Sequence, residues 1–150
     1  MPSLELFNKK TQAYKNKGGS LIIIDDGMLD LTKDIISLFT VYSHHNKASI
    51  ILVTHNLFLS SPIYRTIALN SHYVVLMRSA RTMLQVRNLL HQIYTGPGKD
   101  QLFDMIEHIY NELFSYIVLD CHPHSLLLGV RTNIFSNETP MLTIIKNREL

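Results

Sequence analysis

A run of four aliphatic residues that ends on two carboxylates is the feature that most limits how this chain can fold. Leu21 to Ile24 contains no polar residue and three β-branched ones, and Asp25 and Asp26 follow directly. A continuous apolar run of this length is typical of a strand covered on both faces, as in a parallel sheet. The segment therefore predicts a buried strand with two acids at its carboxyl end.

The rest of the chain alternates between short apolar runs and apolar residues at helical spacing. Further strands are predicted at 49–53, 73–77, 116–119 and 126–130. Helices are predicted at 3–14, at 28–42 with Asp30 as N-cap, at 83–93, and at 102–113 with Asp100 as N-cap. Gly96-Pro97-Gly98 separates the last two helices. Strands alternating with helices predict an α/β fold, with a mainly parallel sheet and helices on both faces.

Length and composition favour one globular domain spanning residues 1–150. The chain is 46% hydrophobic and 17% charged, and it contains no low-complexity segment. No apolar run is long enough to span a bilayer, and the N-terminus lacks the apolar segment of a secretion signal, so we expect no membrane partner. The single cysteine, Cys121, cannot form an intrachain disulfide, which favours an intracellular location. The net charge of +2 is too small to indicate a nucleic-acid partner.

Polar residues follow two of the predicted strands, and ligands of such sheets bind beyond the carboxyl ends of the strands. Of the acids after the first strand, one is suited to bind Mg²⁺ and the other to orient an attacking water. Thr54-His55-Asn56 follows the second strand and could contact a γ-phosphate. Each group also has an ordinary structural interpretation: a loop whose acids cap a helix, and a hydrogen-bonded histidine.

Two motifs that would strengthen a functional assignment are absent or poorly spaced. His44-His45 and Cys121-His122-Pro123-His124 do not have the spacing of a structural zinc site. No Gly-x-x-x-x-Gly-Lys-Ser/Thr phosphate loop occurs, and neither Gly18-Gly19-Ser20 nor Gly96-Pro97-Gly98-Lys99 has its spacing. Without such a loop, the carboxylates alone have little with which to hold a nucleotide.

Several separated motifs nevertheless occur in the same order in one known family. They are Leu21 to Asp26, His44-His45, Ile50 to Phe58, Arg65 through Ser71, and Arg131 to Phe135. Over about residues 20–135, the chain resembles the C-terminal half of viral DNA-packaging ATPases of the FtsK/HerA type. The likeness is closest to those of Maverick/polinton-like elements and adintoviruses.

The resemblance implies the metal- and sensor-bearing half of a P-loop ATPase core that lacks its phosphate-loop half. It implies that Asp25 binds Mg²⁺, that Asp26 activates water in place of the usual Glu, and that Thr54 lies at the nucleotide. It implies γ-phosphate sensing by His55, where the family often has Gln, and by Asn56. Arg65 or Arg81 would act across a subunit interface. Double-stranded DNA, capsid or portal proteins and further copies of the chain are the implied partners, in an infected host cell or a virion.

The missing phosphate loop leaves the activity open. We expect Mg²⁺ and ATP to act as cofactors only if a phosphate-loop half is supplied, and we expect the isolated chain to be inactive. A fragment, a split gene product and a remnant with a new use all fit this pattern. The alternative function is a non-catalytic assembly or binding module derived from such an ATPase. A Mg²⁺-dependent nuclease using Asp25, Asp26 and Asp120 rests on acid placement alone.

Overall fold

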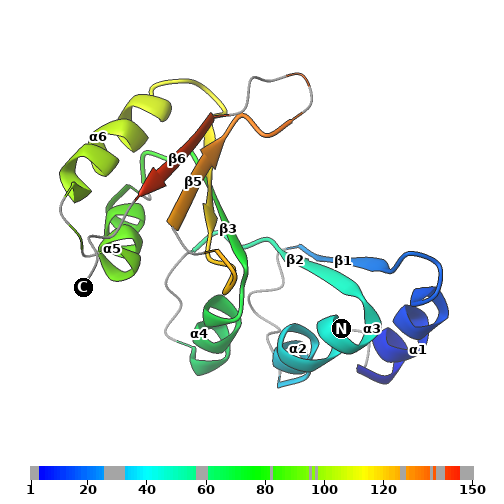
Figure 1. The fold of residues 1–150 in the computed structure, drawn as a ribbon. Helices are drawn as coiled ribbons and strands as arrows, with labels where there is room; N and C mark the ends of the chain where they lie inside the picture. Colours follow the sequence, from blue (N-terminus) through cyan, green and yellow to red (C-terminus); the bar gives the residue numbers. More distant parts are fainter. Residues whose placement is uncertain are drawn as a thin grey trace. The chain divides into compact units, whose positions relative to one another are not determined.

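The computed structural model describes residues 4–25, 33–56, 61–81, 83–94, 96, 98–125, 128–135, 137 and 141–145. Its helices and strands form two compact units, Met1–Asn70 and Ser71–Leu150 (Figure 1). The chain is thus a mixed α/β protein, as predicted. That residues 1–150 form a single domain stays a prediction. Within the described residues, no helix is long and apolar enough to cross a membrane.

The first unit is a pair of parallel strands with helices against one face. Its elements are α1 (Leu4–Tyr14), β1 (Ser20–Ile24), α2 (Lys33–Ser37), the π-helical η2 (Leu38–Tyr42), α3 (Ser43–Asn46), β2 (Ala48–Leu52) and α4 (Pro62–Leu69). β1 and β2 pair in parallel, with Ile22 opposite Ile50. Both strands and their parallel direction agree with the sequence prediction. The helix α4 was not predicted, and Met28 and Asp30 lie outside the described residues.

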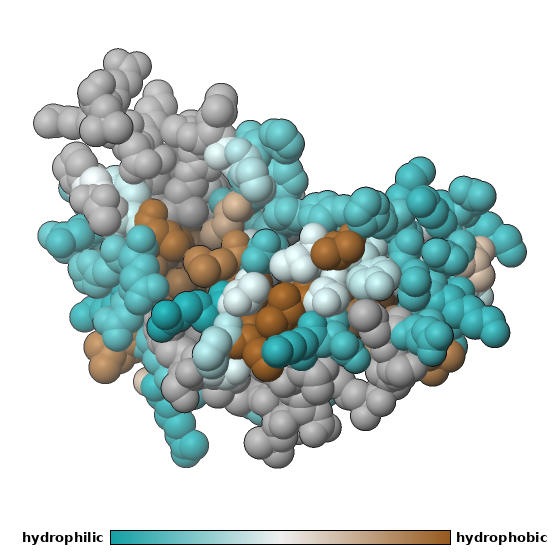
Figure 2. Space-filling model, turned by 90° about the horizontal axis from the view of Figure 1, so that it is seen from below, coloured by the Kyte–Doolittle hydropathy of each residue, from teal (hydrophilic) through white to brown (hydrophobic). Residues whose placement is uncertain are grey.

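Side chains of β1 and β2 alternate between two faces: one face packs against the helices, and the other is exposed. Ile24 is buried with Ile35 and Ile67, and Ile22, Ile50 and Leu52 pack against them. On the opposite face, Leu21, Ile23, Ile51 and Val53 are 42–60% exposed. The prediction that β1 is covered on both faces is therefore wrong, because the described helices pack on one side only. Figure 2 shows apolar residues at the surface as brown patches on the face that it draws.

Two local features join the helices to the start of the strands. The buried Asn46 donates hydrogen bonds from Nδ2 to Asn8 Oδ1 and Thr11 Oγ1, each at 3.0 Å, which ties α3 to α1. Gly19 has a φ of +101°, and a Cβ there would lie 2.4 Å from the backbone oxygen of Lys47. A larger residue would force the entry to β1 away from β2, so the turn after α1 requires glycine at this position.

The second unit is an antiparallel sheet. Its elements are β3 (Tyr73–Met77), α5 (Met83–Ile93), α6 (Lys99–Ile109), β4 (Tyr116–Asp120), β5 (Leu128–Thr132) and β6 (Met141–Ile145). The strands lie in the order β3-β4-β5-β6, and every neighbouring pair is antiparallel. The prediction of a mainly parallel sheet is wrong, since among the described strands β1–β2 is the one parallel pair and the other three pairs are antiparallel. β6 was not predicted, and α6 begins after Gly98 rather than with Asp100 as its cap.

The core of this unit lies between α5, α6 and one face of the sheet. Val86 and Leu90 of α5 and Ile106 of α6 are almost fully buried, as are Ile117 and Leu119 of β4. The other face of the edge strand β3 carries Tyr73, Val75 and Met77, which are 54–60% exposed. β4, in contrast, is buried at all five of its positions, so both of its faces are covered. For this unit, helices on both faces of the sheet stay a prediction.

Candidate functional site

The carboxyl ends of β1 and β2 bring several of the predicted site residues to one edge of the first unit. The parallel pairing continues past both strands, because the backbone N–H of Val53 donates to the oxygen of Ile24 at 2.9 Å. Asp25 follows β1 and is exposed, and His55 follows β2 two residues after Val53. The prediction that Asp25 and His55 lie at neighbouring strand ends is thus confirmed.

The segment after β2 is a short turn whose shape is set by Thr54. The Thr54 hydroxyl donates to the backbone oxygen of Asn56 at 3.2 Å and lies 3.5 Å from Oη of Tyr64 on α4. Thr54 and Asn56 are half-buried, and His55 is exposed. In the geometry described, the Thr54 hydroxyl therefore holds the turn, and its nucleotide-binding role stays a prediction. Asp26, the predicted water-activating residue, lies outside the described residues.

The two arginines predicted to act across a subunit interface lie in different units. Arg65 is an exposed residue of α4, in the same unit as Asp25. Arg81 is exposed in the turn before α5, in the second unit. Both side chains are exposed, as action on a neighbouring subunit would require. Their role stays a prediction.

The described residues at this edge do not by themselves form a metal site. Nowhere in the described residues do three His, Cys, Asp or Glu side chains come close enough to hold a metal. His44 and His45 lie exposed in the last turn of α3. Asp25 is a single carboxylate, which fits Mg²⁺ because this ion is usually bound by one or two carboxylates together with waters and substrate phosphates. The Mg²⁺ role of Asp25 stays a prediction.

A polar cluster in the second unit surrounds Asp120. This carboxylate is buried at the end of β4. It accepts hydrogen bonds from the backbone N–H of His122 at 3.1 Å, the hydroxyl of Ser125 at 2.9 Å and Nη2 of Arg131 at 2.7 Å. Burial by itself would raise the pKa of Asp120, but these hydrogen bonds and the charge of Arg131 outweigh it and lower the pKa.

Strand register explains why this cluster forms. Asp120 is opposite Gly129 on β5, and Arg131 lies two residues farther along the same face. Such diagonal neighbours are within reach of a long side chain, and Gly129 leaves the space between them open. The three hydrogen bonds hold the carboxylate in a structural role. Because these hydrogen bonds already engage the Asp120 carboxylate, the nuclease hypothesis, which needs Asp120 to bind a metal, loses support. The sequence showed the acid and the arginine but not the antiparallel register that joins them.

Three histidine rings gather beside this cluster. The rings of His72 and His122 have centroids 4.6 Å apart, and those of His122 and His124 are 5.2 Å apart. The backbone N–H of His124 donates to Nδ1 of His122 at 3.1 Å, so that ring nitrogen is an acceptor. The backbone N–H of Cys121 donates to the oxygen of His72 at 2.8 Å. Cys121 is exposed, but partial desolvation and the charge of Asp120 raise the pKa of its thiol, which disfavours a nucleophilic thiolate.

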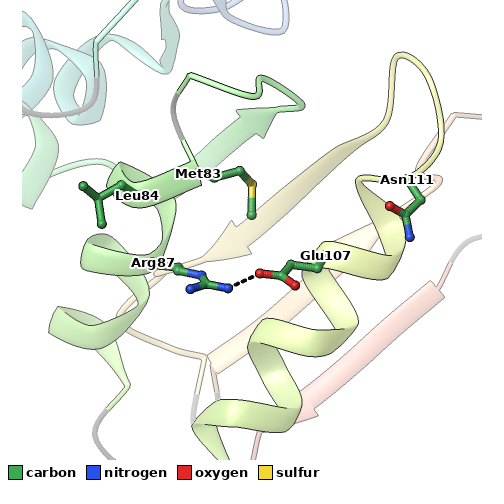
Figure 3. Close-up of a pocket in the computed structure, with 5 residues that line it drawn as sticks. All are labelled: Met83, Leu84, Arg87, Glu107 and Asn111. Carbon is green, nitrogen blue, oxygen red and sulfur yellow. Dashed lines mark hydrogen bonds and ion pairs between the residues drawn. The ribbon is translucent and has the colours of Figure 1, made fainter.

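A shallow hollow of about 400 Å³ lies between α5 and α6 (Figure 3). Its lining is Met83, Leu84, Arg87, Glu107 and Asn111. An ion pair between Arg87 and Glu107 spans it, and both side chains are about half exposed. None of the predicted site residues lines this hollow. A surface ion pair across an open groove is an ordinary way for two helices to meet, and such pairs contribute little to stability.

Comparison with known proteins adds no assignment to this geometry. No family model, no curated protein and no solved structure matches the chain.

Proposed function

We propose that this chain is the metal- and sensor-bearing part of an ATP-driven DNA-packaging motor. One observation carries the proposal: the parallel register of β1 and β2 gives Asp25 and the Thr54–Asn56 turn a common edge. An acid after one strand and a polar turn after its neighbour is the arrangement that phosphoryl transfer needs on one side of the nucleotide. The resemblance of the sequence motifs supplies the class of motor, with double-stranded DNA as its cargo.

In this proposal, each residue acts from its position in the described fold. Asp25 holds Mg²⁺ directly or through water, which neutralises charge on the phosphates. Asp26 orients the attacking water, and His55 and Asn56 contact the γ-phosphate through donors on their side chains. Arg65 or Arg81 reaches the nucleotide of a neighbouring copy and stabilises charge on the transferred group. The exposure of Asp25, His55 and both arginines supports these roles.

The proposed motor is incomplete within these 150 residues. A phosphate loop supplies backbone N–H donors and a lysine to the phosphates, and the sequence contains no such loop. ATP hydrolysis therefore requires a phosphate-loop half provided by other residues. The finer fold assignment, a partial P-loop core, belongs to the same proposal.

A paramagnetic titration tests the metal site without requiring turnover. Mn²⁺ is added to the ¹⁵N-labelled chain, and broadening of the amide signals is followed by NMR. We expect selective broadening at Asp25 and at 54–56, lost in Asp25→Asn and kept in the matched control Asp100→Asn, an exposed acid of α6. Broadening elsewhere, with none at these residues, would refute the metal role.

Hydrolysis by the chain alone gives an independent check. Phosphate release from Mg²⁺–ATP should equal that of a variant carrying Asp25→Ala and Asp26→Ala. Release well above this control would mean that the chain holds phosphates without the missing loop, and the proposal of an incomplete site would be wrong.

The second candidate function, a non-catalytic assembly module, is favoured by the open apolar face of β1 and β2. Leu21, Ile23 and Ile51 are 46–60% exposed on that face. Contiguous apolar surface of this kind usually marks an interaction site. If Mn²⁺ leaves Asp25 unaffected while the chain still associates, this second function replaces the first.

A further inference from the structure

Within the part of the chain that the structure describes, the outer edge of β1 is an unprotected strand edge. Among the described residues, β2 is the only strand that pairs with β1. The described helices pack against β1 on its inner face, where Ile35 and Ile67 meet Ile24. Soluble proteins usually protect such an edge with a lysine, a proline or a bulge. Ser20 to Ile24 has none of these, and Leu21 and Ile23 are 58% and 60% exposed.

The hydrogen bonds to β2 show which backbone groups face the open edge. The N–H of Ser20 donates to the oxygen of Lys47, and the oxygen of Ile24 accepts from Val53. Backbone groups of a strand point alternately to its two sides, so Ser20, Ile22 and Ile24 point towards β2. The N–H and C=O groups of Leu21 and Ile23 therefore point outward and can pair with another strand.

The charges that flank β1 favour a second copy of the chain as that strand. Lys15 and Lys17 precede the strand, and Asp25 and Asp26 follow it. If two β1 strands lie antiparallel, the basic end of each copy meets the acidic end of the other. A parallel arrangement would instead bring like charges together, which costs free energy.

We propose that two copies of this chain associate by antiparallel pairing of their β1 edges. The two-fold axis passes beside Ile22, so Leu21 of each copy is opposite Ile23 of the other. Each such pair exchanges two backbone hydrogen bonds, and the two sheets become one sheet of four strands. Equivalent residues form both sides of the contact, as a two-fold interface requires. This inference does not rest on the proposed motor function.

Proline at one edge position tests the pairing directly. The N–H of Ile23 points away from β2, so Ile23→Pro removes an intermolecular donor and leaves the β1–β2 hydrogen bonds intact. Size-exclusion chromatography with light scattering should give twice the monomer mass of 17.3 kDa for the wild type at micromolar concentration. Ile23→Pro should give the monomer mass with an unchanged circular dichroism spectrum.

Two controls separate edge pairing from association through the apolar face. Ile23→Thr keeps the N–H and the β-branched shape but makes the side chain polar, so the dimer should persist. Ile51→Thr changes the same face on β2, away from the edge, and should also leave the dimer in place. A face-to-face association would be weakened by both threonine variants, and that result would overturn the edge model.

A charge variant keeps the test decisive if Ile23→Pro does not fold. Lys15→Glu with Lys17→Glu replaces the basic residues that precede β1 with acids, so the acidic ends of both copies then face acids of the other copy. The dissociation constant should rise by about tenfold or more at low salt, and by less at high salt, because screening weakens both attraction and repulsion. A wild-type monomer at all concentrations, or a folded Ile23→Pro that remains dimeric, would refute the proposal. No metal or nucleotide is present in these measurements, so their failure would leave the motor proposal standing.

Discussion

Replacing Asp120 with asparagine should destabilise the second unit, and the structure sets the size of the effect. Asp120→Asn keeps the shape and one acceptor oxygen, but it removes the charge and turns an NH₂ group towards Arg131. The carboxylate accepts three hydrogen bonds of 2.7–3.1 Å and is only 6% exposed. A hydrogen bond to a charged group contributes about 1.5–3 kcal/mol. The Arg131 side chain is 46% exposed, which reduces its share because water screens the pair. We therefore expect a loss of about 2 kcal/mol, the lower half of that range.

The pH dependence of this loss gives a sharper test than its size. The pKa of Asp120 in the folded chain lies below its ordinary value of 3.8. The folded state therefore binds fewer protons than the unfolded state, and the charged carboxylate stabilises the fold at pH values above 3.8. This stabilisation is lost as the pH falls through the folded pKa. The difference between wild type and Asp120→Asn should thus be full at pH 7 and shrink below pH 3.8.

Urea unfolding followed by circular dichroism at pH 7 and at several acidic pH values measures both quantities. The exposed carboxylate Asp104 on α6 supplies the control, and Asp104→Asn should change the free energy of unfolding by less than about 0.5 kcal/mol. Equal stability of Asp120→Asn and wild type at pH 7 would refute the assignment of a stabilising cluster. A difference that stays constant into the acidic range would show that the charge is not its source.

Two further predictions concern the same unit. Tyr110→Phe should cost about 1–2 kcal/mol in unfolding free energy, because the buried hydroxyl donates to the oxygen of Leu76 at 2.9 Å, whereas Tyr73→Phe on the exposed face of β3 should cost almost nothing. Thermal unfolding of both variants tests this, and equal losses would contradict it. Cys121 should react with iodoacetamide more slowly than free cysteine at pH 8, because partial desolvation and Asp120 raise the thiol pKa. Asp120→Asn should accelerate the reaction under conditions where the protein stays folded, and an unchanged rate would exclude the influence of that charge.

Local pattern predicted the positions of most elements because each depends on short-range physics. The strand at 73–77 and the helix at 83–93 have the predicted bounds, and 20–24 and 48–52 differ from them by one residue. The buried positions Val86, Leu90 and Ile106 lie on the predicted apolar stripes. Such stripes follow from the period of the helix alone. Whether other elements cover a strand does not follow from the local pattern. For this reason Leu21 and Ile23 were wrongly predicted to be buried.

The candidate sites likewise include one that the sequence could predict and one that it could not. Asp25 and His55 could be placed together from sequence, because one helical crossover between two strands makes them parallel and adjacent. The Asp120–Arg131 pair could not be placed, because it depends on the register between β4 and β5. The π-helical turn at Leu38–Tyr42 and the buried Asn46 that joins α3 to α1 likewise have no signature in the sequence pattern.

The direction of β4 relative to β3 could nevertheless have been predicted from the sequence. A strand followed by one helix returns to its starting end and continues in parallel, whereas two consecutive helices bring the chain back to the end where the strand finished. The next strand must then run antiparallel. Gly96-Pro97-Gly98 already indicated two helices between the strands at 73–77 and 116–119, and α5 and α6 are those helices. Between β1 and β2, the described helical residues form one continuous run, 33–46, and those two strands are parallel. For these two connections, the number of helices between the strands agrees with the direction of the second strand, whereas the alternation of strands with helices does not. The connection from β2 through α4 to β3 leads into a different sheet, so the helix count does not predict which strands pair.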